Sequence, residues 1–112
     1  MIMSKTVKRR ISVDGAQYVW VLDGNSINRP NDTHIRVHKE GTTGNILYID
    51  PYNWHFEIRP KFIAEAIRFA LNAGWEDRTK ATGIYVAYFD DEFQVLPKGV
   101  KFRYQINKDA DA

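Results

Sequence analysis

The chain has no cysteine among its 112 residues, and it has no long apolar run. Without cysteine it can form neither disulfides nor thiolate zinc sites, and it has no cysteine nucleophile. This absence also fits a reducing compartment. No stretch reaches the length of a signal peptide or the roughly 20 apolar residues that span a bilayer. We therefore expect a cytoplasmic protein with no membrane partner.

A large excess of charge of either sign is also missing. The 16 Lys and Arg residues face 14 Asp and Glu residues, so the sequence pI of about 8.9 gives little reason by itself to expect a nucleic-acid partner. The charge is uneven along the chain, because residues 1–39 contain seven basic and three acidic residues, whereas residues 40–112 contain nine and eleven. The length suits a single domain over residues 1–112, with loose ends at 1–6 and 107–112.

Motifs for catalysis, phosphate binding and metal binding are missing as well. None of the three serines lies in a Gly-x-Ser-x-Gly sequence. The glycines of residues 41–44 lack the Gly-Lys-Ser/Thr sequence and the helix of a phosphate-binding loop. His34 and His38 lie four residues apart on a predicted strand, which separates them by about 13 Å, too far to share one ion. We therefore expect no cofactor and no metal, and the sequence does not indicate an enzyme.

One segment has the pattern of an amphipathic helix. Pro60 suits the first helical position, because it lacks the N–H that would have no acceptor there. Gly74 can adopt the left-handed conformation that ends a helix, and Trp75 can then fold back onto the last turn. Apolar residues recur between them at the spacing of one helical stripe: Ile63, Ala66, Ile67, Ala70 and Leu71. This pattern predicts a helix over about residues 60–73, with Ile67 at the centre of its buried face.

Short apolar or alternating runs surround this helix. They cover residues 9–13, 17–22, 33–39, 46–50, 54–58, 83–89, 93–96 and 100–106. Asp14-Gly15, between the first two runs, is typical of a tight hairpin turn. Most connections are too short for a parallel crossover. We therefore predict an α+β fold: a single twisted, mostly antiparallel sheet of about six or seven short strands with the one helix packed on one face.

The order of these segments is similar to that of a known group of proteins. Strands that contain Asp14-Gly15 and Tyr18-x-Trp20 precede the proline-started helix, which ends in Ala70-Leu71-Asn72-Ala73-Gly74-Trp75. This order resembles a pattern found in small uncharacterised bacterial proteins, and the similar part covers residues 11–75. The resemblance implies no activity, cofactor or site residue.

The first functional hypothesis is a small, non-enzymatic interaction domain. One short helix cannot cover a wide sheet, and an uncovered apolar face favours a partner. Aromatic residues make up 13% of the chain, and Trp20 and Trp54 are candidate binding residues of an aromatic patch or pocket, with a purely structural core as the alternative. We expect another protein, or a second copy of this chain in a homodimer, to bind through a sheet edge or an aromatic patch.

The second hypothesis is a nucleic-acid or polyanion module. Lys8 and Arg10 alternate on one predicted strand, and Arg36 and His38 on another, so the two strands would form a basic strip if they were neighbours with the same face outward. Arg29, in the turn-rich loop before the second of these strands, is a further candidate. The alternative is that these charges keep the strands soluble and discourage edge pairing.

The third hypothesis is a small enzyme or ligand pocket around Asp50, His55 and Glu57. His55 and Glu57 share one face of a predicted strand about 7 Å apart. Asp50 comes just before the bend that precedes them. A histidine beside carboxylates suits acid–base chemistry. The spacing identifies no further ligand for a metal.

Overall fold

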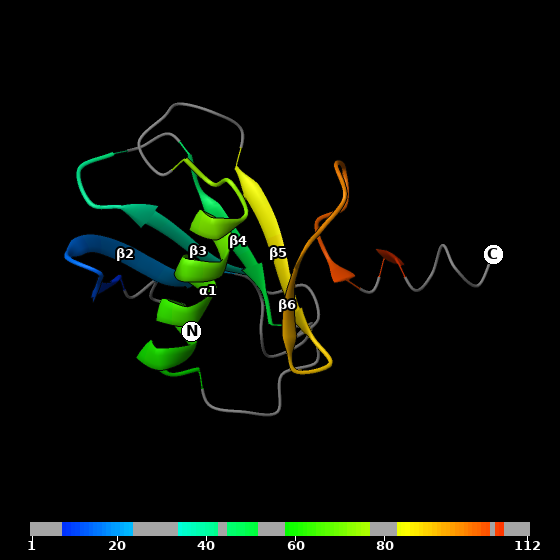
Figure 1. Cartoon of the computed structure of the whole chain (residues 1–112), viewed down its shortest axis with the longest axis horizontal. Coiled ribbons are helices and arrows are strands. Elements are labelled where there is room, and N and C mark those ends of the chain that lie inside the picture. Colours follow the sequence, from blue (N-terminus) through cyan, green and yellow to red (C-terminus); the bar gives the residue numbers. More distant parts are fainter. Residues whose placement is uncertain are drawn as a thin grey trace, which may run out of the picture.

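The computed structural model describes residues 8–23, 34–42, 45–51, 58–76, 83–103 and 105–106. Within these ranges the chain forms one six-stranded sheet and one helix, α1, which Figure 1 shows in front of the sheet. In chain order the elements are β1 (Arg9–Val13), β2 (Ala16–Asp23), β3 (His34–Lys39), β4 (Leu47–Asp50), α1 (Pro60–Asn72), β5 (Ile84–Phe89) and β6 (Glu92–Val95).

The order of the strands in the sheet is their order along the chain, from β1 at one edge to β6 at the other. Neighbouring strands are antiparallel except β4 and β5, which are parallel and are connected through α1. The predicted α+β class, with one mostly antiparallel sheet and a helix on one face, is therefore confirmed. No helix in the described ranges is long and apolar enough to cross a membrane.

Two-residue turns close the hairpins at both ends of the sheet. Asp14 and Gly15 between β1 and β2 have φ angles of 51° and 87°, and Asp90 and Asp91 between β5 and β6 have φ angles of 58° and 62°. Positive φ at both central residues is the property of type I′ turns, whose twist matches that of the flanking strands. The first turn agrees with the prediction from Asp14-Gly15. The second uses two aspartates, which tolerate the left-handed region better than most residues.

The helix begins and ends as the sequence predicts. Pro60 is its first residue, and Gly74, with a φ angle of 107°, follows its C-terminal end. The N–H of Trp75 donates to the carbonyl oxygen of Ala70 at 2.9 Å, and the N–H of Gly74 donates to that of Leu71 at 3.2 Å. These two bonds form a Schellman motif, which turns the chain back along the helix. Trp75 is consequently buried, with its ring 6.0 Å from that of Tyr18.

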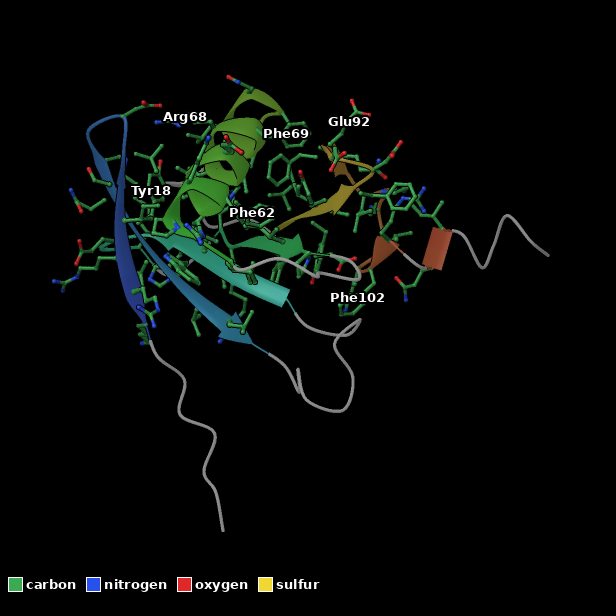
Figure 2. All side chains as sticks on the ribbon, turned by 90° about the horizontal axis from the view of Figure 1, so that it is seen from below. Tyr18, Phe62, Arg68, Phe69, Glu92 and Phe102 are labelled. Carbon is green, nitrogen blue, oxygen red and sulfur yellow. The ribbon has the colours of Figure 1, made fainter. Side chains whose placement is uncertain are left out.

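The core lies between α1 and one face of the sheet. Four residues of the predicted stripe have no exposed surface: Ile63, Ala66, Ile67 and Ala70. Leu71, the fifth, is only partly buried, so the buried stripe is narrower than predicted. Figure 2 shows the β1–β2 hairpin rising beside α1, and there Arg68 Nε lies 3.2 Å from Asp14 Oδ2. The sheet residues that complete the core are Val13, Tyr18, Trp20, Ile35, Val37, Leu47, Ile49 and Val86.

The predicted strand over residues 100–106 is wrong. Of the described residues in this stretch, Arg103, Gln105 and Ile106 are helical, and none belongs to a strand. Gln105 Oε1 accepts hydrogen bonds from the N–H groups of Lys101 at 2.9 Å and Phe102 at 3.1 Å, and the N–H of Gln105 donates to the carbonyl of Phe102. Local bonds of this kind compete with the ladder of a sheet. The predicted strand over 54–58 and the predicted loose ends lie almost wholly outside the described residues.

Candidate binding surfaces

The register of the strands separates two faces of the sheet. Successive side chains of a strand point to opposite faces, and the core residues above define the face toward α1. We call the opposite face the outer face. Two rows of directly paired residues cross it. One row contains Arg10, Val19 and His38, and the other contains Val21, Arg36, Tyr48 and Tyr85.

Basic side chains gather on the outer face over β1 and β3. Lys8 and Arg10 are exposed, and Arg36 and His38 are half-buried. Burial lowers the pKa of His38 below its ordinary value, and the charges of Lys8 and Arg36 lower it further, while Glu40 opposes them. Glu40 also forms an ion pair with Arg10, with Oε2 3.0 Å from Nε. Two positive charges and one carboxylate therefore act on His38, and the carboxylate of Glu40 opposes the other two.

The predicted basic strip is thus interrupted. β1 and β3 present their basic residues on the same face, but β2 lies between them. Two strand spacings separate the two sets by about 10 Å. Val19 and Val21 fill the middle of this surface, so it is a basic frame around apolar residues rather than a continuous strip.

A stacked tyrosine pair continues the outer face beyond Arg36. The rings of Tyr48 on β4 and Tyr85 on β5 lie 4.4 Å apart with an angle of 7° between their planes. Gly83 makes room for this arrangement, because a Cβ there would lie 2.7 Å from Tyr48 Cε2 and would overlap the carbonyl oxygen of Ile46. The chain therefore requires glycine at the entry to β5.

The C-terminal end of the described chain lies against the outer face over β4 to β6. Asp50 is almost completely buried there, and its Oδ2 accepts a hydrogen bond from the N–H of Arg103 at 2.7 Å. Arg103 Nε donates to Gln94 Oε1 at 2.7 Å, and the guanidinium carbon lies 4.1 Å from the centre of the Phe89 ring. Figure 2 shows Phe102 on the side of the sheet away from α1. Asp50 thus anchors this segment to β4.

The structure places the predicted site residues in different parts of the molecule. Trp20 faces α1 with 7% of its surface exposed, and the guanidinium carbon of Arg9 lies 5.9 Å from its ring centre. Arg36 and His38 lie on the outer face, so the structure does not bring them together with Trp20. Among the described residues, no three His, Asp or Glu side chains form a group that could hold a metal. The remaining candidates lie outside the described residues: Arg29, Trp54, His55 and Glu57.

An aromatic cluster lies at the other end of the helix-covered face, beside β6. It consists of Phe62 and Phe69 on α1, Tyr88 on β5 and Phe93 on β6. Phe62 is 5.1 Å from Tyr88 and 5.3 Å from Phe93, and Phe93 is 5.7 Å from Phe69 and 4.9 Å from Tyr88, measured between ring centres. All four side chains remain partly exposed. The reason is that β6 is the last strand, so nothing in the described sheet covers their outer side.

The edge of β6 differs from the edge of β1. β1 carries exposed Arg9 and Arg10 and is preceded by exposed Lys8, and such charges discourage pairing with another strand. On β6 the apolar side chain of Val95 is 45% exposed. Leu22 on β2, at 36%, is the other large apolar residue of the described chain with comparable exposure. An edge strand with an exposed apolar residue next to a partly exposed aromatic cluster is suited to pairing.

The sequence contains a signal for this cluster that the strand and helix patterns do not reveal directly. Phe62 and Phe69 lie seven residues apart, which places them on one side of α1 next to the buried stripe. Large apolar residues beside a buried stripe make the apolar face of a helix wider than the part that packs against its own sheet.

Searches against protein-family models, curated proteins and solved structures found no match for this chain.

Proposed function

We propose that this protein is a non-enzymatic interaction domain that binds an extended segment of another polypeptide along the β6 edge. The observation that carries the proposal is that β6 combines an edge to which no further strand of the described residues pairs, the exposed side chain of Val95 and the partly exposed cluster around Phe93. In strand addition, main-chain hydrogen bonds supply affinity, and alternate side chains of the added strand supply specificity. A strand added to β6 would also cover the outer side of the aromatic cluster, because its alternate side chains would point toward the α1 face.

The chemistry of the segment follows from the end of the hairpin. Asp90, Asp91 and Glu92 are all exposed at the start of β6. Three carboxylates at one end of an edge favour a positively charged group at the corresponding end of the bound strand. We therefore expect a segment with alternating apolar residues and at least one Lys or Arg at the end beside the β5–β6 turn.

Nuclear magnetic resonance of the 15N-labelled protein tests strand addition. A synthetic peptide with alternating Val and Lys is titrated in, and the same peptide with proline at alternate positions, which removes the backbone donors, is the control. We expect the amides of Phe93 and Val95 to shift and to become protected from hydrogen exchange with the first peptide alone. Val95→Lys should weaken this binding, and Leu22→Lys should leave it unchanged. Shifts at the amides of Arg10 and Ser12 on β1 instead of β6, or none at millimolar peptide, would refute the proposal.

A second candidate function is binding of a polyanion on the outer face. The specific observation is that Lys8, Arg10, Arg36 and His38 share this face, where burial and, after it, the charges of Lys8 and Arg36 lower the pKa of His38. The ion pair of Arg10 with Glu40 reduces the net positive charge of this face, so the site is less positive than the sequence predicts. A phosphate backbone contacted here would release counterions.

Fluorescence anisotropy with a labelled single-stranded oligonucleotide tests this second candidate. The affinity should fall steeply with salt. Lys8→Ala should reduce the slope of the logarithm of the binding constant against the logarithm of the salt concentration by roughly one. Lys61→Ala, which removes an exposed charge on the far side of α1, is the matched control. Absence of binding at low salt would eliminate the polyanion function and would leave the interaction function untouched.

A further inference from the structure

We propose that the segment bound at the β6 edge is β6 of a second copy of this chain, paired antiparallel with Gln94 opposite Gln94 of the second copy. This inference rests on the proposed function, because it assigns the partner of the same edge. Three properties of β6 favour this pairing: the direction of its backbone groups, the pairing of its side chains and the charge at its ends.

The backbone groups of β6 fix the register. The N–H of Leu96 donates to the carbonyl of Tyr85 at 2.9 Å, so the backbone groups of Leu96 point toward β5. Backbone groups of an antiparallel strand point alternately to its two sides. The N–H and C=O groups of Phe93 and Val95 therefore point away from β5, and no hydrogen bond within the described chain uses them.

Only one symmetric register uses all of these groups. When Gln94 lies opposite Gln94 of the second copy, Phe93 lies opposite Val95 and Val95 lies opposite Phe93. Each of these two pairs then exchanges both N–H to carbonyl bonds, while the central Gln94 pair lies between them without bonds, as the antiparallel pattern requires. A shift of the centre to Phe93 or to Val95 leaves part of the outward groups without a partner.

The side chains agree with this register. Residues directly opposite each other on two antiparallel strands point to the same face and pack together. Val95, which is 45% exposed in the single chain, would therefore pack against Phe93 of the second copy. Because the two copies are related by a two-fold axis perpendicular to the sheet, both α1 helices lie on the same side. The two aromatic clusters would then approach each other across the axis, and their exposed sides would be covered.

The charges agree as well. In the same register, the acidic turn of one copy, Asp90 and Asp91, lies at the end of the pair where β6 of the second copy leads toward Lys98, and all three residues are exposed. The two Glu92 residues lie at opposite ends of the pair, separated by four residues or about 13 Å. The acidic turn of each copy thus lies at the end of the second copy's β6 that leads to a basic residue, and the two acidic turns lie at opposite ends of the pair.

Sedimentation equilibrium of the full chain tests whether the dimer exists and which edge forms it. We expect a monomer–dimer equilibrium at micromolar to millimolar concentration. Val95→Lys should raise the dissociation constant by about tenfold or more, which corresponds to about 1.4 kcal/mol. Leu22→Lys is the matched control, because it places the same charge on the other exposed apolar residue and should leave the constant unchanged. Val95→Thr keeps the branched shape of the side chain and replaces Val95→Lys if the lysine variant does not fold. Circular dichroism melting verifies that each variant is folded.

Disulfide cross-linking tests the register. The natural chain has no cysteine, so any disulfide must come from the introduced residue. The Cα atoms of a central pair without hydrogen bonds lie about 4.5 Å apart, within the range of about 4.4–6.8 Å for disulfides. Gln94→Cys should therefore give a covalent dimer on mild oxidation. Ser12→Cys, an exposed residue at the β1 edge, should remain monomeric under the same conditions.

The outcomes separate the inference from the proposed function. Loss of the dimer in the Val95 variants together with cross-linking of Gln94→Cys supports the inference. A monomer at every concentration that still binds the Val/Lys peptide at β6 overturns the inference and retains the proposed function. A dimer that survives Val95→Lys and does not cross-link through residue 94 also overturns the inference. Absence of both dimer and peptide binding overturns both.

Discussion

Ile67→Ala is the substitution whose effect follows most directly from the structure. Ile67 has no exposed surface and lies in the middle of the buried stripe of α1. The change removes three carbon atoms at about 0.8 kcal/mol each, or about 2.4 kcal/mol of transfer free energy. A cavity adds to this, and such substitutions cost about 2–5 kcal/mol in total. Against a stability of about 5–15 kcal/mol for a small domain, this is a large loss.

Urea unfolding followed by tryptophan fluorescence measures this loss as a shift of the midpoint at constant slope. Two residues on the exposed side of the same helix are the controls. Glu65→Ala should change stability by less than about 0.5 kcal/mol. Arg68→Ala removes the ion pair with Asp14, in which both side chains are at least half exposed, and should cost no more than about 1 kcal/mol. Equal midpoints for the Ile67 and Glu65 variants would mean that the buried face of α1 is assigned wrongly.

Two further predictions concern the outer face. Gly83→Ala should destabilise the protein by at least about 1–3 kcal/mol, because the new Cβ overlaps the carbonyl oxygen of Ile46. This oxygen cannot move without disturbing β4. A melting temperature equal to that of the natural protein would contradict the prediction. Since burial, Lys8 and Arg36 lower the pKa of His38, the unfolded chain binds its proton more readily, and stability should rise with pH from that lowered pKa up to about 6.5. Urea unfolding midpoints of the natural protein at pH 5 and pH 7.5 check this. The difference between these midpoints should be smaller in His38→Gln. A difference equal to that of the natural protein would assign the effect to another group.

The parts of the fold that depend on neighbouring residues could be predicted from the sequence. Asp14-Gly15 defines a turn through the conformational freedom of those two residues, and Pro60 and Gly74 define the ends of α1 in the same way. The buried stripe followed from its spacing, apart from Leu71. Each of these signals acts over one or two turns of chain, so no knowledge of the rest of the molecule was needed.

The parts that depend on the order of the strands could not be predicted. The partly exposed state of Phe93 and Val95 is a consequence of β6 being an edge, which is a property of the whole sheet. Residues 100–106 alternate like a strand, and the bonds from Gln105 to the backbone that replace the strand leave no mark on that pattern. The hypothesis of a basic strip required β1 and β3 to be neighbours, and only the topology shows that β2 separates them.

The order of the strands also bears on how the chain folds. Because each strand from β2 to β4 pairs with the strand made just before it, these contacts close short loops, for which the entropic cost is low. The exception is the parallel pair of β4 and β5, whose strands are separated along the chain by α1 and therefore close a longer loop. A low mean sequence separation between contacting residues favours fast folding. The connection from β4 through α1 to β5 is therefore the slowest to close. A chain emerging from the ribosome can therefore assemble its first four strands early, and the docking of α1 with β5 is the step expected to limit the rate.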